Sequence, residues 1–361
     1  MRNLYYIFVH GISGWGSYDK AYEWMPYWGI FGGDLITYLR SQGFAAFAAS
    51  VAPTGSAWDR TCELYAQISG TSTDYGAAHS AANRHERFGR DFTGRTLIPE
   101  WDPDTRIVLL GHSFGGATVR LFSELLAHGD RNEQESLPVD QLSGLFSGGM
   151  ADRIHSIVTL ASPMNGTAAY DMFLDETFDP SQVKVPLWSR VGSKMVSMGT
   201  KPRQDGRAKS DYANFDMHID NALKLNERIS TLPDVYYFSV PCSSTVRQPD
   251  GTQTPDHGKT EPLFVMSSYQ IGQYSGKTQG GVVIDEKWHE NDGLVNTFSA
   301  MAPLGAPQKA LDRTDIRPGI WNVFPTYDGD HMALQGGLMR KHDIRDFYTD
   351  LLEMIESTFS G

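Results

Sequence analysis

A short apolar run passes directly into a glycine-rich turn and then into a helical pattern. Residues 106–110 read RIVLL, a run typical of a buried strand. Residues 111–115 read GHSFG, and from Ala117 onward the apolar residues recur at helical spacing. Strand, G-x-S-x-G and helix in this order predict a nucleophile elbow, a tight turn that exposes a serine oxygen at the N-terminus of a helix. Ser113 is therefore the candidate nucleophile.

Apolar strand-like runs alternate with helical patterns along most of the chain. The strand candidates are residues 4–9, 45–51, 106–110, 154–160, 235–240 and 323–326. The helix candidates are residues 33–42, 58–69, 117–127, 215–229 and 342–359. This alternation predicts an α/β fold with a mostly parallel central sheet and helices on both faces.

The chain shows no internal repeat and no low-complexity linker, so we expect a single α/β domain over residues 1–361. Three stretches are too long to be simple connections between a strand and a helix. They lie at about 70–99, 168–212 and 243–309. Insertions of this length inside a compact domain usually carry function.

Charge and apolar patterning narrow the possible partners. A formal net charge of −12 argues against nucleic acid, whose phosphates would repel the chain, and against docking on anionic lipid. No apolar run approaches the length that spans a bilayer. Residues 1–4 run directly into a strand-like segment with no visible signal peptide, so the chain is either intracellular or the mature form of a secreted protein. Of the two cysteines, Cys62 lies in a helical pattern, where we expect a buried free thiol.

A serine nucleophile requires a base and an acid that orients the base. In α/β folds with a nucleophile elbow of this kind, the expected order along the chain is serine, acid, histidine. His331 lies in a glycine-flanked loop between the last strand candidate and the last helix candidate, and is the preferred base, with His289 a weaker rival. Asp292, in a compact turn before an apolar segment, is the leading acid candidate. The residues alone leave three other acids open, and these are Asp315, Asp328 and Asp330.

His10-Gly11 directly follows the first strand candidate. In this position the pair directs a backbone N–H toward the active site. Ile12 N–H and Phe114 N–H are the predicted donors of the oxyanion hole. Each such donor stabilises a transition state by roughly 3 kcal/mol.

A second set of residues has the chemistry of a metal site. His79 and His85 lie six residues apart, and Asp59 lies twenty residues before His79. Imidazole together with carboxylate suits Zn²⁺. On spacing alone, two solvated histidines on a helix surface are the more common explanation.

Five segments in register give the chain a family resemblance. They are VHGISGWG, the long segment from Trp58 to Phe92, GHSFGGATVRL, VTLASPMNGT and ENDGLVNTFS. Together they resemble the thermoalkalophilic and staphylococcal lipases of the α/β-hydrolase fold, including the clostridial relatives that hydrolyse polyesters. The resemblance extends from Leu4 to His331.

The resemblance implies roles for individual residues. The catalytic set of the family falls on Ser113, Asp292 and His331. Its structural zinc ligands fall on Asp59, His79, His85 and Asp211, with Asp216 as the alternative to Asp211. Four protein ligands imply a closed structural site, without an open position for water.

Three departures from the family pattern imply differences in the surroundings of the serine. No carboxylate follows His331 at the positions of the family's calcium site, so we expect that calcium site to be absent. Ile12 stands where an aromatic residue is usual, which implies a reshaped acyl pocket. The segment 168–212 is shorter than the corresponding cover of the true lipases, which implies a shortened lid.

These observations predict a serine carboxylic ester hydrolase that acts on lipid or polyester esters through an acyl-enzyme. The alternatives are an acyltransferase or peptidase with the same triad, and a non-catalytic ligand-binding protein of this fold. The family resemblance favours a secreted protein. Acyl chain length and oligomeric state are left open by the sequence.

Overall fold

The computed structural model describes residues 3–175, 178–179, 183, 205–337 and 342–359. Its central sheet has seven strands in the order β13-β14-β7-β6-β5-β1-β2, and all neighbouring strands run parallel. The strands are β1 (Asn3–Val9), β2 (Ala46–Ala49), β5 (Thr105–His112), β6 (Ile154–Leu160), β7 (Tyr236–Val240), β13 (Gln308–Ala310) and β14 (Trp321–Val323). The predicted parallel sheet is confirmed.

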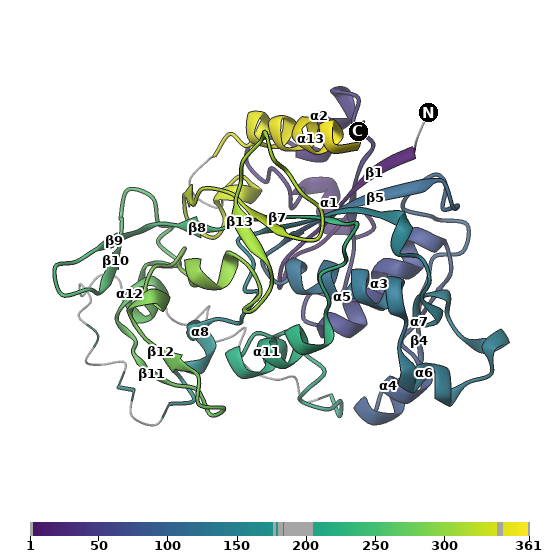
Figure 1. Cartoon of the computed structure of the whole chain (residues 1–361), viewed down its shortest axis with the longest axis horizontal. Coiled ribbons are helices and arrows are strands. Elements are labelled where there is room, and N and C mark those ends of the chain that lie inside the picture. Colours follow the sequence, from purple (N-terminus) through teal and green to yellow (C-terminus); the bar gives the residue numbers. More distant parts are fainter. Residues whose placement is uncertain (1–2, 176–177, 180–182, 184–204, 338–341, 360–361) are drawn as a thin grey trace.

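Helices cover both faces of this sheet (Figure 1). On one face lie α2 (Leu35–Ser41) and α13 (Arg345–Phe359), and on the other lie α3 (Ala57–Ser69) and α5 (Gly115–His128). Side chains of β1 alternate between the faces because successive residues of a strand point to opposite sides. Tyr6 and Phe8 pack in the core under α2 and α13, whereas Ile7 and Val9 pack in the core under α3 and α5.

Smaller elements surround the sheet. The remaining helices are α1 (Lys20–Trp24), α4 (Ala77–Asn83), α6 (Arg131–Ser136), α7 (Gly144–Ser147), α8 (Ala168–Asp171), α10 (Ala213–Asp216), α11 (Ile219–Arg228) and α12 (Val265–Gln273). The 3₁₀ turns are η1 (Val139–Gln141), η2 (Ala151–Arg153), η5 (Glu286–Trp288), η6 (Thr297–Ala300) and η7 (Ala333–Gln335). Four two-stranded sheets pair β3 (Ser72–Asp74) with β4 (Phe88–Asp91), β8 (Cys242–Ser243) with β15 (Tyr327–Asp328), β9 (Thr245–Arg247) with β10 (Gln253–Pro255), and β11 (Gly276–Lys277) with β12 (Val283–Ile284).

The connection from β5 to α5 is tight enough to require glycine at two positions. A Cβ atom at Gly111 would lie 2.4 Å from the carbonyl oxygen of Gly115, and one at Gly115 would lie 2.3 Å from the carbonyl oxygen of Val9. Between them Ser113 has φ +55°, a left-handed conformation that is uncommon for residues other than glycine. The structure therefore contains the predicted strained turn with a serine at its apex.

One predicted strand is wrong. Residues 323–326 were expected to form the last strand, but β14 ends at Val323. Pro325 has no backbone N–H and cannot extend the hydrogen-bond ladder of an interior strand. The residues before it, with Trp321 buried in the core, form the strand instead.

Three further expectations can be compared with the structure. Cys62 and Cys242 are both buried free thiols, as expected for Cys62. None of the described helices is long and apolar enough to cross a membrane. The shortened lid predicted within 168–212 falls largely outside the described residues.

Candidate active site and metal-binding group

Ser113 lies at the carboxyl end of β5, where the chain turns into α5. Its backbone N–H donates to the carbonyl oxygen of Leu160 at 2.9 Å, which ties the turn to the end of β6. The loop after β1 passes directly beside it, because a Cβ atom at Gly11 would lie 2.7 Å from Cβ of Ser113. Ser113 is buried with an exposed fraction of 4%, so a substrate reaches it through a cavity and not from an open surface.

Asp292, His331 and Ser113 form one line of hydrogen bonds. Nε2 of His331 lies 2.8 Å from Oγ of Ser113. On the other side of the ring, Nδ1 lies 2.9 Å from Oδ2 of Asp292. The backbone N–H of His331 also donates to the carbonyl oxygen of Asp292 at 2.8 Å, so two contacts hold the histidine loop on the aspartate turn. The structure thus brings together the three residues that the sequence singled out.

The other candidates for acid and base have different partners. Asp315 accepts hydrogen bonds from Lys309 and Arg317, and Asp328 accepts one from Lys259. Asp330 accepts from the backbone N–H groups of Glu261 and Met332. His289 contacts Ser275 and the carbonyl oxygen of Tyr274. Among these candidates, His331 is the residue that contacts Ser113, and Asp292 is the acid that contacts His331.

Two backbone N–H groups beside Ser113 have no acceptor in the described part of the chain. They belong to Ile12, which follows β1, and to Phe114, which caps α5. Phe114 is buried, and Ile12 lines the same cavity as Ser113. These are the two predicted oxyanion donors.

A chain of hydrogen bonds connects the loop after β1 to the histidine loop. Nε2 of His112 lies 2.8 Å from the carbonyl oxygen of His331, and Nδ1 lies 2.7 Å from the Tyr27 hydroxyl. Burial lowers the pKa of His112 to about 3, so the ring is neutral and has one N–H. Because a carbonyl only accepts, Nε2 carries that hydrogen and Tyr27 donates to Nδ1. The Tyr27 oxygen in turn accepts the N–H of Gly11 at 3.1 Å.

The cavity at Ser113 has a volume of about 340 Å³ and a mostly apolar lining. Its lining includes Ile12, Tyr170, Phe264, Leu294, Val295 and Met332. Such a lining favours an acyl or alcohol group with few polar atoms.

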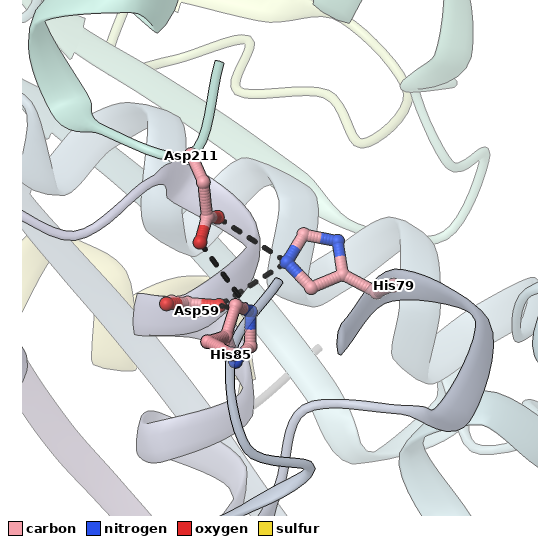
Figure 2. Close-up of side chains that lie close together, drawn as sticks. All are labelled: Asp59, His79, His85 and Asp211. Carbon is pink, nitrogen blue, oxygen red and sulfur yellow. Dashed lines mark hydrogen bonds and ion pairs between the residues drawn. The ribbon is translucent and has the colours of Figure 1, made fainter. Parts of the chain in front are cut away.

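Asp59, His79, His85 and Asp211 point toward one another, and their ligand atoms all lie within 4.8 Å of one another (Figure 2). Asp59 comes from α3, His79 from α4, His85 from the loop after α4, and Asp211 from the loop before α10. Nε2 of His79 lies 3.2 Å from Oδ1 of Asp59 and 3.3 Å from Oδ1 of Asp211. Nε2 of His85 lies 3.3 Å from Oδ2 of Asp211.

This group has the unsatisfied atoms expected of a metal site. Nε2 of His85 and Oδ2 of Asp211 are fully enclosed and make no hydrogen bond. Buried polar atoms without a partner are costly, and a cation between them would satisfy both. The set therefore fits a divalent metal ion. The alternative ligand Asp216 lies outside the group and accepts the N–H of Ala57 at 2.7 Å.

Neighbouring residues fix the orientation of the group. The indole of Trp58 stacks on the His79 ring with 4.9 Å between ring centroids. Arg207 donates to Oδ2 of Asp59 at 2.9 Å, and Ser56 donates to Oδ1 of Asp211 at 2.8 Å.

The sequence reasoning did not assign Tyr27, His112 or Arg207 to either site. Tyr27 and Arg207 lie in irregular segments without a motif, so no local pattern indicates their partners. His112 lies inside the G-x-S-x-G motif, and its position next to Ser113 is a signal that could have been used.

Comparison with known proteins gives consistent matches. The family model of lipase-like C-terminal domains matches residues 3–196 and 203–358. Lipase 2 of Staphylococcus aureus is 32% identical over 377 residues, which covers 96% of this chain and 53% of that protein. The chain thus spans about half the length of the curated relatives it matches.

Solved structures resemble the whole chain. EstA from Clostridium botulinum superposes with a TM-score of 0.83 at 28% identity, covering 98% of this chain and 87% of that chain. The lipase of Staphylococcus hyicus superposes with a TM-score of 0.80 at 28% identity, covering 100% of this chain and 98% of that chain.

Proposed function

Because the chain belongs to the family of lipase-like C-terminal domains, we propose that it is a carboxylic ester hydrolase with Ser113 as its nucleophile. The observation that most supports this proposal is the line of hydrogen bonds from Asp292 through His331 to Ser113. Two unpaired backbone N–H groups beside the serine support it further, because ester hydrolysis needs donors for an oxyanion.

In the proposed reaction Oγ of Ser113 attacks the ester carbonyl while Nε2 of His331 takes the hydroxyl proton. The N–H groups of Ile12 and Phe114 donate to the tetrahedral oxyanion. The C–O bond to the alcohol then breaks, His331 returns the proton to the leaving alkoxide, and an acyl-serine ester is left. Water attacks this ester with His331 as the base, and the acid is released with Ser113 restored. Asp292 stays ionised and stabilises the imidazolium that forms in each half-reaction.

The cavity supports a substrate class of esters with apolar acyl or alcohol groups. A lipid ester and an aliphatic polyester both present a carbonyl flanked by methylene groups, so both fit a mostly apolar cavity of about 340 Å³.

We propose Zn²⁺ as the ion held by Asp59, His79, His85 and Asp211. Two imidazoles and two carboxylates form a complete tetrahedral set for zinc. A bound ion would connect α3, α4 and the loop before α10, and its contribution would be structural. No step of the reaction requires it.

Replacing Ser113 with alanine tests the proposed activity. Ser113→Ala should lower the turnover of p-nitrophenyl butyrate at least about 10³-fold, because loss of a triad member removes most of the chemical step. Ser123→Ala is the matched control, since Ser123 is a buried serine of α5, the helix that follows Ser113, and its hydroxyl donates to the carbonyl of Arg120. It should retain wild-type turnover.

Turnover of Ser113→Ala close to that of the wild type would contradict the assignment. Matched ester and amide substrates, with and without an added alcohol acceptor, separate hydrolase from peptidase and acyltransferase. Failure of a fluorophosphonate to label Ser113 would favour the non-catalytic alternative.

A further inference from the structure

Arg60 is a fully buried cation of α3 whose hydrogen-bond acceptors are all neutral. Its Nε donates to Oγ1 of Thr118 at 2.9 Å, and Nη1 donates to the carbonyl oxygen of Ala52 at 3.1 Å. Nη2 donates to the carbonyl oxygen of His10. Within the part of the chain that the structure describes, Arg60 forms no ion pair. Glu63 acts on Arg60 electrostatically but from beyond ion-pair distance. Burial of a guanidinium without a carboxylate in direct contact is costly, so its position suggests a role besides fold stability.

The fourth acceptor of Arg60 lies next to the candidate oxyanion hole. Nη1 lies 3.4 Å from the carbonyl oxygen of Gly11. That carbonyl belongs to the same peptide group as the N–H of Ile12. Because a trans peptide is planar, its C=O and N–H point in opposite directions. A donor that holds the Gly11 carbonyl from behind therefore directs the N–H of Ile12 toward the opposite side.

His10 holds the same carbonyl with a defined tautomer. Its Nδ1 lies 2.8 Å from the carbonyl oxygen of Gly11, and its Nε2 accepts the N–H of Val51 at 3.4 Å. The ring is fully buried, and burial lowers its pKa to about 3, so it is neutral with one N–H. Since Nε2 accepts, Nδ1 carries the hydrogen and donates to Gly11.

Arg60 also contacts the residue that supplies the second oxyanion donor. Its guanidinium carbon lies 5.2 Å from the centroid of the Phe114 ring, within the range of a cation–π contact. The same guanidinium thus contacts the Gly11–Ile12 peptide through its carbonyl oxygen and the ring of Phe114, the residue that supplies the other free N–H beside Ser113. A hydrogen bond from a cation to a peptide carbonyl also polarises the N–H of that peptide, and a buried positive charge is weakly screened.

We propose that Arg60, assisted by His10, is a positioning residue that holds the Gly11–Ile12 peptide with its N–H toward the oxyanion and supplies positive potential behind it. This inference rests on the proposed function, because it concerns the oxyanion of that reaction. It gives α3, which also supplies Asp59 of the metal-binding group, a part in organising the active site.

The test compares kcat, KM and the affinity for an oxyanion analogue. Arg60→Met should lower kcat for p-nitrophenyl butyrate about 10²-fold, as loss of one oxyanion donor does, with KM changed less than about threefold. The Ki of an alkyl trifluoromethyl ketone, which forms a tetrahedral oxyanion adduct with a serine, should rise by a similar factor. Arg60→Lys keeps the charge and should recover part of both losses.

Arg120→Met is the matched control, because Arg120 is also buried, donates to the neutral Oδ1 of Asn226 at 2.7 Å and lies 6.0 Å from the Trp321 ring. It should lose stability but keep kcat and Ki. If Arg60→Met does not fold, variants of His10 test the inference. His10→Leu should lower kcat. His10→Asn should have a higher kcat than His10→Leu, because its amide can donate to the Gly11 carbonyl.

An Arg60→Met protein with kcat and Ki within about threefold of the wild type overturns the inference. A decrease in kcat for Arg120→Met as large as that for Arg60→Met overturns it as well. Equal kcat for His10→Leu and His10→Asn overturns it when Arg60→Met does not fold. A wild-type protein that hydrolyses no ester overturns the proposed function itself and this inference with it.

Discussion

At the scale of single residues, the two carboxylate oxygens of Asp292 have different partners. Oδ2 faces Nδ1 of His331, whereas Oδ1 accepts the backbone N–H groups of Leu294 at 3.0 Å and Val295 at 2.7 Å. The backbone of the turn therefore orients the carboxylate through contacts that do not involve the imidazole. A fixed acceptor at Nδ1 keeps the hydrogen on that nitrogen and leaves Nε2 free to accept the proton of Ser113.

The substitution Asp292→Asn tests this arrangement. An amide group facing His331 favours the tautomer with hydrogen on Nε2, which cannot act as a base, so kcat should fall roughly 10³- to 10⁴-fold. Asp315→Asn and Asp328→Asn are controls, because those carboxylates contact lysine or arginine side chains, and both variants should retain activity. Steady-state kinetics on p-nitrophenyl butyrate measures all three. Near-normal kcat for Asp292→Asn would remove this residue from the proposed triad.

The difference between Ser113 and Asp292 indicates what the residues alone can predict. Ser113 is marked by its neighbours in sequence, because strand, turn and helix adjoin it directly. The acid is marked only by a contact across 39 residues, so sequence reasoning left four aspartates open. His10 was marked only as part of the His10-Gly11 pair, and Arg60 carried no signal for this role, because the acceptors of Arg60 come from segments that only the folded chain brings together.

At the scale of elements, β6 carries a buried histidine between the sheet and the C-terminal helix. The ring of His155 stacks on Tyr236 of β7 with centroids 5.3 Å apart and meets Phe359 of α13 edge-on at 5.0 Å. Burial, together with the charge of Arg106, lowers the pKa of His155 to about 4. The contact of Phe359 in α13 with β6 is therefore made with a neutral imidazole.

The lowered pKa of His155 predicts acid sensitivity. At pH values well above 6.5, the ordinary pKa of histidine, His155 is neutral in the folded and the unfolded chain. As the pH falls from 6.5 toward 4, the unfolded chain binds a proton that the folded chain does not, so the free energy of unfolding decreases. The contribution of this residue is at most about 3.4 kcal/mol.

Urea unfolding at pH 7 and pH 4.5 measures the effect. His155→Phe keeps the aromatic packing and should lose less stability between the two pH values than the wild type. Ser156→Ala removes the contact of its hydroxyl with Nδ1 of His155, which lies 2.7 Å away, but keeps the imidazole, so its pH dependence should match the wild type. An unchanged pH dependence in His155→Phe would show that this histidine does not govern acid sensitivity.

One helix was predicted as continuous but is interrupted. Residues 215–229 were expected to form a single helix, whereas α10 ends at Asp216 and α11 begins at Ile219. The N–H of Ile219 is capped at 2.8 Å by Oδ2 of Asp171, a residue of α8 that lies 48 residues earlier. Apolar spacing cannot reveal such a cap, since the carboxylate comes from a distant segment.

At the scale of the whole molecule, the metal-binding group connects three distant parts of the chain. It joins α3, the insertion that carries α4, and the loop that leads to α10 and α11 (Figure 1). In the absence of an ion, two carboxylates and two imidazoles would face one another, with Arg207 as a cation that contacts both carboxylates. An ion bound only to the folded chain adds stability in proportion to the logarithm of its concentration over Kd.

Removal of the metal should therefore lower Tm. With zinc at about 100 times its Kd, the loss is about 3 kcal/mol, equivalent to about 4 °C in a chain of this size. Differential scanning fluorimetry after dipicolinate treatment measures it, and added Zn²⁺ should restore the original Tm.

Variants distinguish the two candidate fourth ligands. Asp211→Asn should lower the metal content measured by mass spectrometry, and Asp216→Asn should retain it, because Asp216 lies outside the group. Protein purified without chelator that contains no zinc would contradict the assignment of the ion. Full metal retention by Asp211→Asn would contradict the ligand set.

The separation of Ser113 from His331 has a consequence for how the protein is made. The two residues lie 218 positions apart, although their side chains are in hydrogen-bond contact. At 5–20 residues per second, a ribosome that has added the serine needs roughly 10 to 40 seconds more before it adds the base. A growing chain therefore lacks the proposed base while it already carries the proposed nucleophile. The proposed esterase activity can begin only after the late segments have been translated and folded against the early ones.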